Sequence, residues 1–302
     1  MPECSPEHNG LSGCVLVLIP AGVYDTCHTR FRSNQVPYTE SSEDGVRLFY
    51  QTYSTSNRTE SDAASMIFVH GAGGNAASWW QQVPHFVDRY SILTIDHRGF
   101  ARSACTPAQF SAKHFSDDLL TIMDAEQIDS AILVCQSMGG WTGLTTALGY
   151  PDRVRALVMS HTPGGLTSET IREIQQMAAR NRSALESPFA HWAVAPDYHE
   201  KSPEMSLLYS QISAFNTSLD LSKLDLQSIQ LSADDFLGHK IPTLFVTAEQ
   251  DVIFPPEMIR LASEMVPGAD FIELQGAGHS SYFETAGAFN QAVDAFLDAL
   301  PF

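Results

Sequence analysis

Seven apolar runs recur along the chain between residues 46 and 274, and helix-compatible stretches separate most of them. Short apolar runs that alternate with helices are typical of parallel strands joined by helical crossovers, and strands buried on both faces of a sheet are apolar throughout. We therefore predict an α/β fold in which a mostly parallel sheet is flanked by helices. The runs lie near residues 46–53, 66–70, 91–96, 131–135, 154–160, 243–248 and 270–274, and a first hairpin is expected to begin near Tyr38.

The run at 131–135 leads into the sequence CQSMGG at residues 135–140, which places Ser137 between a strand and a helix. A sharp turn of this kind needs small residues around its apex, because strand and helix approach each other closely. Gly139 and Gly140 provide the clearance. Cys135 stands where a first glycine is usual, but it is still small. The segment predicts a nucleophile elbow, and the alternative is an ordinary strand-to-helix turn with a capping serine.

Other chemically competent segments also follow apolar runs. The glycine-rich loop HGAGG occupies residues 70–74, and DHRGFARS occupies residues 96–103. Glu249 and Asp251 follow the run at 243–248, and His279 ends the sequence GAGH after the alternating segment 271–274. Serine, carboxylate and histidine therefore occur in this order, each just after a predicted strand.

With these motifs the chain resembles the α/β-hydrolase fold family over roughly residues 38–302. The resemblance implies that the reacting groups lie at the carboxyl ends of the strands, and that a cap is inserted after the strand ending near residue 160. The interval from 165 to 240 is too long for a simple connection and has helical stretches at 167–182 and 203–216. We predict an N-terminal extension (1–37), a core (38–165 and 240–302) and a helical cap (166–239), which is either a mobile lid or fixed.

Each residue type suits one step of acyl transfer. Ser137 is a weak nucleophile as a neutral hydroxyl, and His279 is the candidate base because an imidazole titrates near neutral pH. Asp251 is the preferred acid for orienting the imidazole, with Glu249 as its competitor. The family pattern assigns the oxyanion hole to the backbone N–H groups of Ala72 and Met138.

Two further residues are candidate substrate contacts. His161 follows a strand whose end usually faces the cavity in this family, so it has either a substrate-binding or a structural role. Trp192 belongs to an aromatic, proline-containing piece of the predicted cap at 188–192. Cap side chains are expected to contribute substrate contacts and to exclude water, while the core carries the reacting groups.

Composition excludes several partners and cofactors. The formal net charge of -18 argues against nucleic acid binding, and the five cysteines lack metal-ligand spacing. The apolar stretch at 14–19 is too short to span a membrane and no basic residue precedes it, which favours a cytoplasmic protein with no membrane partner. A serine triad requires neither cofactor nor metal. The extension at 1–37 is an extra packed strand, an arm of a homodimer or a partly disordered tail.

The sequence thus predicts a serine hydrolase that cleaves a carboxylic ester or lactone of a small to medium, largely apolar molecule. Three enzymatic alternatives use the same triad: an acyltransferase, a carbon-carbon bond hydrolase and a cofactor-free haloperoxidase. A non-catalytic ligand receptor on the same fold is an alternative of another class.

Overall fold

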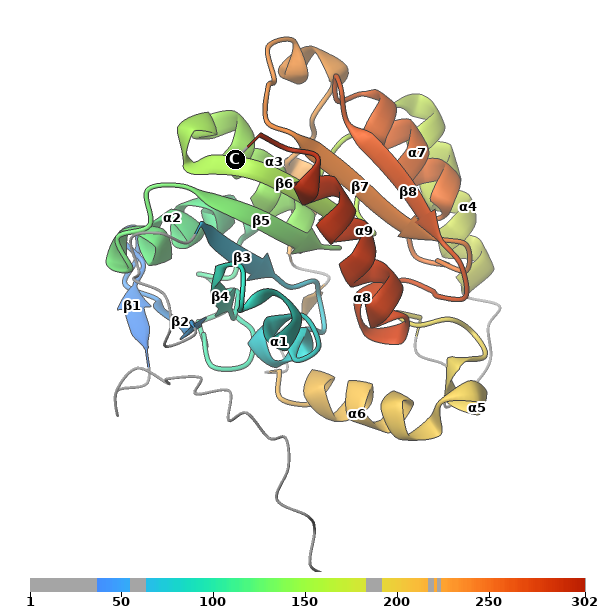
Figure 1. Cartoon of the computed structure of the whole chain (residues 1–302), viewed down its shortest axis with the longest axis horizontal. Helices are drawn as coiled ribbons and strands as arrows, with labels where there is room; N and C mark the ends of the chain where they lie inside the picture. Colours follow the sequence, from blue (N-terminus) through green and yellow to red (C-terminus); the bar gives the residue numbers. More distant parts are fainter. Residues whose placement is uncertain (1–36, 55–63, 183–191, 217–219, 222–223, 302) are drawn as a thin grey trace, which may run out of the picture.

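One sheet dominates the computed structural model of the protein, which describes residues 37–54, 64–182, 192–216, 220–221 and 224–301 (Figure 1). Its strand order within these residues is β1-β2-β4-β3-β5-β6-β7-β8. Neighbouring strands from β4 to β8 pair in parallel, whereas β1 and β2 form an antiparallel edge. The predicted mostly parallel sheet is confirmed, and the extension predicted at 1–37 lies almost entirely outside the described residues. The strands are β1 (Tyr38–Glu40), β2 (Arg47–Tyr53), β3 (Ser65–Val69), β4 (Ser91–Ile95), β5 (Ala131–Gln136), β6 (Val154–Ser160), β7 (Thr243–Ala248) and β8 (Asp270–Leu274).

Helices cover both faces of the sheet (Figure 1). Alternate residues of a strand point to opposite faces, so Ile67 and Val69 join the hydrophobic cluster under α2, α3 and α7, while Met66 and Phe68 join the cluster under α1, α8 and α9. Burial on both faces explains why the strands read as continuous apolar runs. The helices are α1 (Val83–Phe86), α2 (Phe115–Ala125), α3 (Gly139–Gly149), α4 (Glu169–Arg182), α5 (Tyr198–Lys201), α6 (Pro203–Ser213), α7 (Pro256–Glu264), α8 (Ser281–Glu284) and α9 (Ala286–Asp298). None of these helices is both long and apolar enough to cross a membrane.

The register of the parallel strands brings their carboxyl ends to one level. Gln136 at the end of β5 pairs with Ser160 at the end of β6, and Ser160 pairs in turn with Val246 of β7. Ala248, the last residue of β7, pairs with Leu274, the last residue of β8. The loops that follow these four strands therefore meet at one edge of the sheet.

The insertion between β6 and β7 carries α4, α5 and α6. Ile171 of α4 is buried in the cluster that contains α7, whereas Ile212 of α6 is buried in the cluster on the opposite face. Two amides join the end of α6 to the glycine-rich loop: Asn75 Nδ2 donates to the carbonyl of Ile212 (2.8 Å), and Asn216 Nδ2 donates to the carbonyl of Gly73 (2.8 Å). The insertion thus packs on both core clusters and contacts a loop of the candidate site.

Candidate active site

The turn after β5 has the close contacts that a nucleophile elbow requires. Ser137 has a φ of +49°, a left-handed conformation that is uncommon and strained for a non-glycine residue. Its N–H donates to the carbonyl of Ser160 (2.9 Å), which holds the turn. A Cβ at Gly139 would lie 2.5 Å from the carbonyl oxygen of Val69, so only glycine fits beside the end of β3.

Cys135 replaces the usual first glycine of this turn, and the helix compensates. A Cβ at Gly143 of α3 would lie 2.7 Å from Cys135 Sγ, so the space for the sulfur comes from a glycine on the opposite side of the contact. Burial raises the pKa of the Cys135 thiol, which keeps it protonated near neutral pH. Cys135 is a packing residue, whereas Ser137 presents a partly exposed hydroxyl at the turn.

The structure brings Ser137, His279 and Asp251 into one hydrogen-bonded array. Ser137 Oγ lies 2.8 Å from His279 Nε2, and His279 Nδ1 lies 2.9 Å from Asp251 Oδ2. His279 and Asp251 are almost fully buried, whereas Ser137 is partly exposed. Each side chain comes from a loop at the same edge of the sheet, after β5, β8 and β7 respectively. The array can move a proton from the serine hydroxyl to an imidazole that is oriented by a carboxylate.

Asp251 occupies an environment that favours its ionised form. Its Oδ1 accepts hydrogen bonds from the backbone N–H groups of Ile253 (2.8 Å) and Phe254 (2.9 Å). Burial by itself raises the pKa of the Asp251 carboxyl, but the nearby charge of His279 and the hydrogen bonds from both neighbouring imidazoles outweigh burial and lower it. The competitor Glu249 is exposed and accepts from the N–H of Gly276 (2.9 Å), so it lies outside the array.

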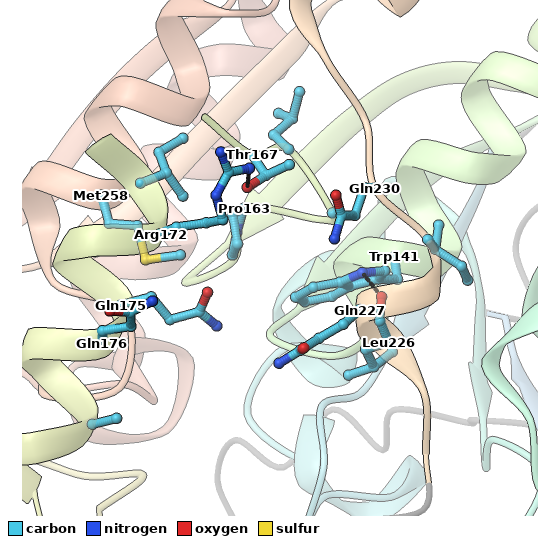
Figure 2. A pocket seen from close by; sticks show the side chains of 15 residues that line it. Trp141, Pro163, Thr167, Arg172, Gln175, Gln176, Leu226, Gln227, Gln230 and Met258 are labelled. Carbon is cyan, nitrogen blue, oxygen red and sulfur yellow. Dashed lines mark hydrogen bonds between the residues drawn. The ribbon is translucent and has the colours of Figure 1, made fainter. Parts of the chain in front are cut away.

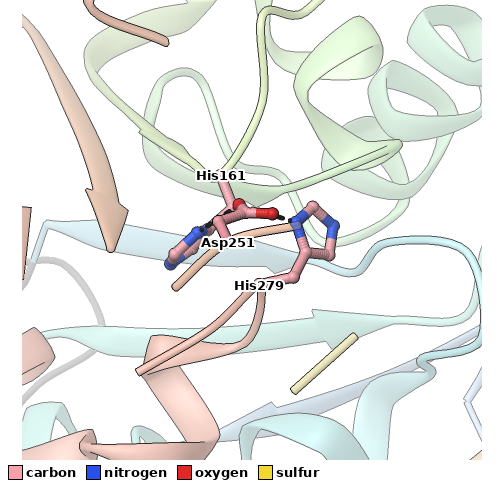
Figure 3. Close-up of side chains that lie close together, drawn as sticks. All are labelled: His161, Asp251 and His279. Atoms are coloured by element: carbon pink, nitrogen blue, oxygen red, sulfur yellow. Dashed lines mark hydrogen bonds and ion pairs between the residues drawn. The ribbon is translucent and has the colours of Figure 1, made fainter. Parts of the chain in front are cut away.

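His161 lies on the other side of Asp251 (Figure 3). Its Nδ1 is 2.9 Å from Asp251 Oδ2, and its Nε2 is 2.7 Å from Ser281 Oγ. We predicted either a substrate contact or a structural role, and the ring has no exposed surface and uses both nitrogens inside the protein. His161 therefore contacts Asp251 and Ser281 inside the protein, which fits the structural role and not a substrate contact.

The glycine-rich loop after β3 lies against the elbow. A Cβ at Gly71 would come within 2.7 Å of Ser137 Cβ. His70 Nδ1 donates to the carbonyl of Gly71 (2.8 Å), and its Nε2 accepts from the N–H of His97 (2.9 Å), which fixes the loop. Neither Ala72 N–H nor Met138 N–H donates to an acceptor in the described part of the chain. Within these residues, both predicted oxyanion donors are thus free of protein acceptors.

Two residues that hold the histidine loop were not predicted from the sequence. Gln136 Nε2 donates to the carbonyl of His279 (3.1 Å) and so links the elbow to the base. The Glu284 carboxylate accepts from the N–H groups of Gly278 (3.0 Å) and Ser280 (3.1 Å), and from Ala195 (2.7 Å) in the insertion. Glu284 belongs to no recognisable motif, and Gln136 lies in the elbow sequence CQSMGG at a position to which no role was assigned. Proximity to Ser137 in the sequence was the single available signal, and it applied to Gln136 alone.

A pocket of about 420 Å³ opens beside Trp141, one helical turn beyond the elbow (Figure 2). Trp141 Nε1 donates to the carbonyl of Leu226 (3.1 Å), and α4 provides another part of the wall. Among the described residues, Arg172 is the one charged residue that lines this pocket. Trp192, which was predicted to contact the substrate, does not line this pocket. Its side chain is 49% exposed, three residues before Ala195, whose N–H donates to Glu284. The polar lining consists of Thr167, Arg172, Gln175, Gln176, Gln227 and Gln230.

His161, Asp251 and His279 form a cluster whose possible metal-ligand atoms lie within 4.8 Å of one another. Both histidines direct Nδ1 at the same carboxylate oxygen. A nitrogen that donates a hydrogen bond carries a proton and has no lone pair for a metal. The geometry therefore fits a hydrogen-bonded array, and a metal at these three atoms would have to break both contacts.

Comparisons with known proteins agree with this architecture. A model of the α/β hydrolase fold matches residues 64–286. The chain is 26% identical over 260 residues to 3-oxoadipate enol-lactonase 2 of Acinetobacter baylyi, a match that covers 83% of this chain and 93% of the relative. It is 38% identical over 260 residues to a protein of Caulobacter segnis named provisionally as the carbamate hydrolase RutD, covering 77% and 91%. Among solved structures, the enol-lactonase from Burkholderia xenovorans LB400 has a TM-score of 0.69 at 24% identity, covering 87% of this chain and all of that one.

Proposed function

Because the chain belongs to the α/β-hydrolase fold family, we propose that it is a serine hydrolase that cleaves a carboxylic ester or lactone through an acyl-enzyme. The observation that supports this most directly is the continuous array from Ser137 Oγ through His279 to Asp251, with spacings of 2.8 and 2.9 Å. The partly exposed serine on a strained turn is accessible to a substrate carbonyl, whereas the base and the acid are shielded from water.

The proposed reaction has two halves, acylation of Ser137 and hydrolysis of the acyl-enzyme, and His279 transfers a proton in both. His279 Nε2 takes the proton of Ser137 as Oγ attacks the carbonyl carbon, and the oxyanion of the tetrahedral intermediate accepts hydrogen bonds from the N–H groups of Ala72 and Met138. The intermediate collapses as His279 returns the proton to the leaving alkoxide. Water then attacks the acyl-enzyme with His279 as base, and Ser137 regains its proton as the acid leaves. Asp251 keeps His279 in the tautomer that accepts at Nε2.

We propose the substrate only by the type of bond that is cleaved. Relatives named as an enol-lactonase and as a carbamate hydrolase suggest a lactone, an ester or a carbamate as probes. The pocket beside Trp141 combines apolar residues with four glutamines and Arg172, but neither Ser137 nor His279 lines it, so its lining does not define the substrate of the proposed site.

The first experiment labels the protein with a serine-directed phosphonate and locates the adduct by intact-protein and peptide mass spectrometry. Wild-type protein is expected to carry one adduct on Ser137, Ser137→Ala none, and Ser116→Ala, whose hydroxyl lies on α2 against Thr146, the same adduct as wild type. Turnover of an aryl acetate, a small lactone and an aryl carbamate should fall by several orders of magnitude in Ser137→Ala. An adduct that persists in Ser137→Ala would refute the assignment, and tight binding without turnover would favour the receptor alternative.

A further inference from the structure

Asp251 carries two serine–histidine pairs instead of one. Ser137 and His279 form the first, and Ser281 and His161 form the second, with spacings of 2.7 Å from Ser281 Oγ to His161 Nε2 and 2.9 Å from His161 Nδ1 to Asp251 Oδ2. Both imidazoles end on the same carboxylate oxygen, and their ring centroids lie 5.6 Å apart at an interplanar angle of 67°. We call these pairs the first and second arms of the array. Ser137 of the first arm is partly exposed, whereas Ser281 of the second arm is fully buried at the start of α8 and cannot contact a substrate.

The protonation of the second arm follows from its partners. Burial lowers the pKa of His161, and the hydrogen bond to Asp251 offsets this in part, so the ring is neutral near pH 7. A neutral imidazole has one N–H, and facing a carboxylate that proton sits on Nδ1. His161 Nε2 then accepts from the Ser281 hydroxyl, which fixes the tautomer. The charged or titratable groups that act on His161 among the described residues are Asp251 and His279.

The second arm fills the last acceptor site of the triad carboxylate. Oδ1 of Asp251 already accepts from two backbone N–H groups, and Oδ2 accepts from both imidazoles. A carboxylate offers about four lone-pair sites, so its hydrogen bonding is complete. Without His161 the buried Oδ2 would keep one donor, and more of its negative charge would act on His279.

We propose that His161 is a positioning residue of this site: locked in one tautomer by Ser281, its Nδ1–H fixes the Asp251 carboxylate opposite His279 and takes up part of its charge. This inference rests on the proposed serine hydrolase function. The left-handed backbone of His161, with a φ of +52°, turns its side chain toward Asp251 directly after β6. His161 thereby holds the carboxylate that orients His279.

The test measures the rate of phosphonate labelling of Ser137 against pH, which reports on the base without depending on a chosen substrate. His161→Leu removes the donor, whereas His161→Asn keeps an N–H at the place of Nδ1. In His161→Leu we expect the acidic limb of the labelling profile to move up by about half a pH unit, because Asp251 loses one hydrogen-bond donor and keeps more of its negative charge opposite the imidazole. In His161→Asn the limb should stay within about 0.2 pH units of wild type. The Glu284 carboxylate also interacts electrostatically with His279, and because neither variant changes Glu284, its effect is the same in both.

The controls separate the possible failures. His239→Leu removes a partly buried histidine that contacts Phe236 and Thr243 at the amino end of β7, the end opposite to the site, and should leave the limb unchanged. An unmoved limb in His161→Leu, with wild-type Ser137 still labelled, overturns this inference and leaves the proposed function intact. Absence of labelling on wild-type Ser137 overturns both.

Wild-type protein gives an independent test if the leucine variant does not fold. Histidine ¹⁵N NMR at pH 7 should show His161 neutral, with its proton on Nδ1, and the signal should disappear in His161→Asn. A protonated His161, or a proton on Nε2, contradicts the proposal whatever the variants do.

Discussion

Asp251→Asn is the most informative single change in the site. The carboxylate accepts from two imidazole N–H groups through Oδ2 and from the backbone N–H groups of Ile253 and Phe254 through Oδ1. An amide has one oxygen, so in either orientation its NH₂ faces two of these four donors. The backbone N–H groups cannot shift their protons, so we expect the amide oxygen to accept from them and the NH₂ group to face the two imidazoles. Replacing charge-assisted hydrogen bonds by neutral ones then costs roughly 1–3 kcal/mol of stability.

The catalytic loss follows from the tautomer. With an NH₂ group opposite Nδ1, His279 avoids the clash by moving its proton to Nε2, where it can no longer accept from Ser137. A loss of this kind costs about 10⁴ in kcat in the serine proteases, which corresponds to about 5.5 kcal/mol of transition-state stabilisation. Labelling and aryl ester turnover should both fall by about that factor in protein whose circular dichroism spectrum is native.

Glu249→Gln is the matched control for this change. Glu249 is exposed and accepts from Gly276 N–H, which an amide oxygen can also do, so we expect turnover within about twofold of wild type. If Glu249→Gln were the more damaging change, or if Asp251→Asn lost less than about tenfold, the role assigned to Asp251 would be wrong.

Three further outcomes are expected. Gly139→Ala should destabilise the protein by about 1–3 kcal/mol, because its Cβ would meet the Val69 carbonyl at 2.5 Å, whereas Gly149→Ala, with no atom within 4 Å, should be neutral or better in thermal unfolding. The pKa of Asp251 is lowered in the folded protein, so its ionised form adds stability that is complete above the unfolded pKa of about 3.9 and is lost as pH falls below it. In urea titrations, the free energies of unfolding of wild type and Asp251→Asn should therefore converge below about pH 4. Trp192→Asp should change the preference among esters of different acyl size, while the rate of labelling by a small phosphonate stays within about threefold of wild type. Equal losses of ester turnover and of labelling would show that the insertion organises the catalytic groups.

The strands could be predicted because burial on both faces leaves a simple pattern in the sequence. Val154–Ser160, Thr243–Ala248 and Asp270–Leu274 match the apolar runs from which they were predicted, and the remaining central strands differ by a residue or two. Ser137, Asp251 and His279 could be placed together for the same reason, since each follows a parallel strand and the carboxyl ends of such strands share an edge. The resemblance to α/β-hydrolases drawn from these motifs is confirmed by the family match.

The second arm of the array could not be predicted in this way. Ser281 lies 120 residues from His161, and Asp251 lies 90 residues from it, so no local spacing links them. Their contact depends on the left-handed turn at His161 and on where α8 begins, which are set by packing. The insertion shows the same limit: helical periodicity placed α4 and α6 closely, but it carried no information on the contacts of Asn216 and Ala195 with the loops of the site.

The order of the triad along the chain has a consequence for biosynthesis. Ser137 precedes His279 by 142 residues, so at 5–20 residues per second a ribosome makes the proposed nucleophile roughly 7–28 seconds before its proposed base. During that interval the serine is an ordinary hydroxyl, and the nascent chain cannot be acylated by esters in its surroundings. On the proposed function, we expect the serine to become reactive only when β8 pairs with β7 and the His279 loop contacts Gln136. Chains stalled on the ribosome before β8 should therefore leave a phosphonate unreacted, and reactivity should arise in one step when the histidine loop has emerged.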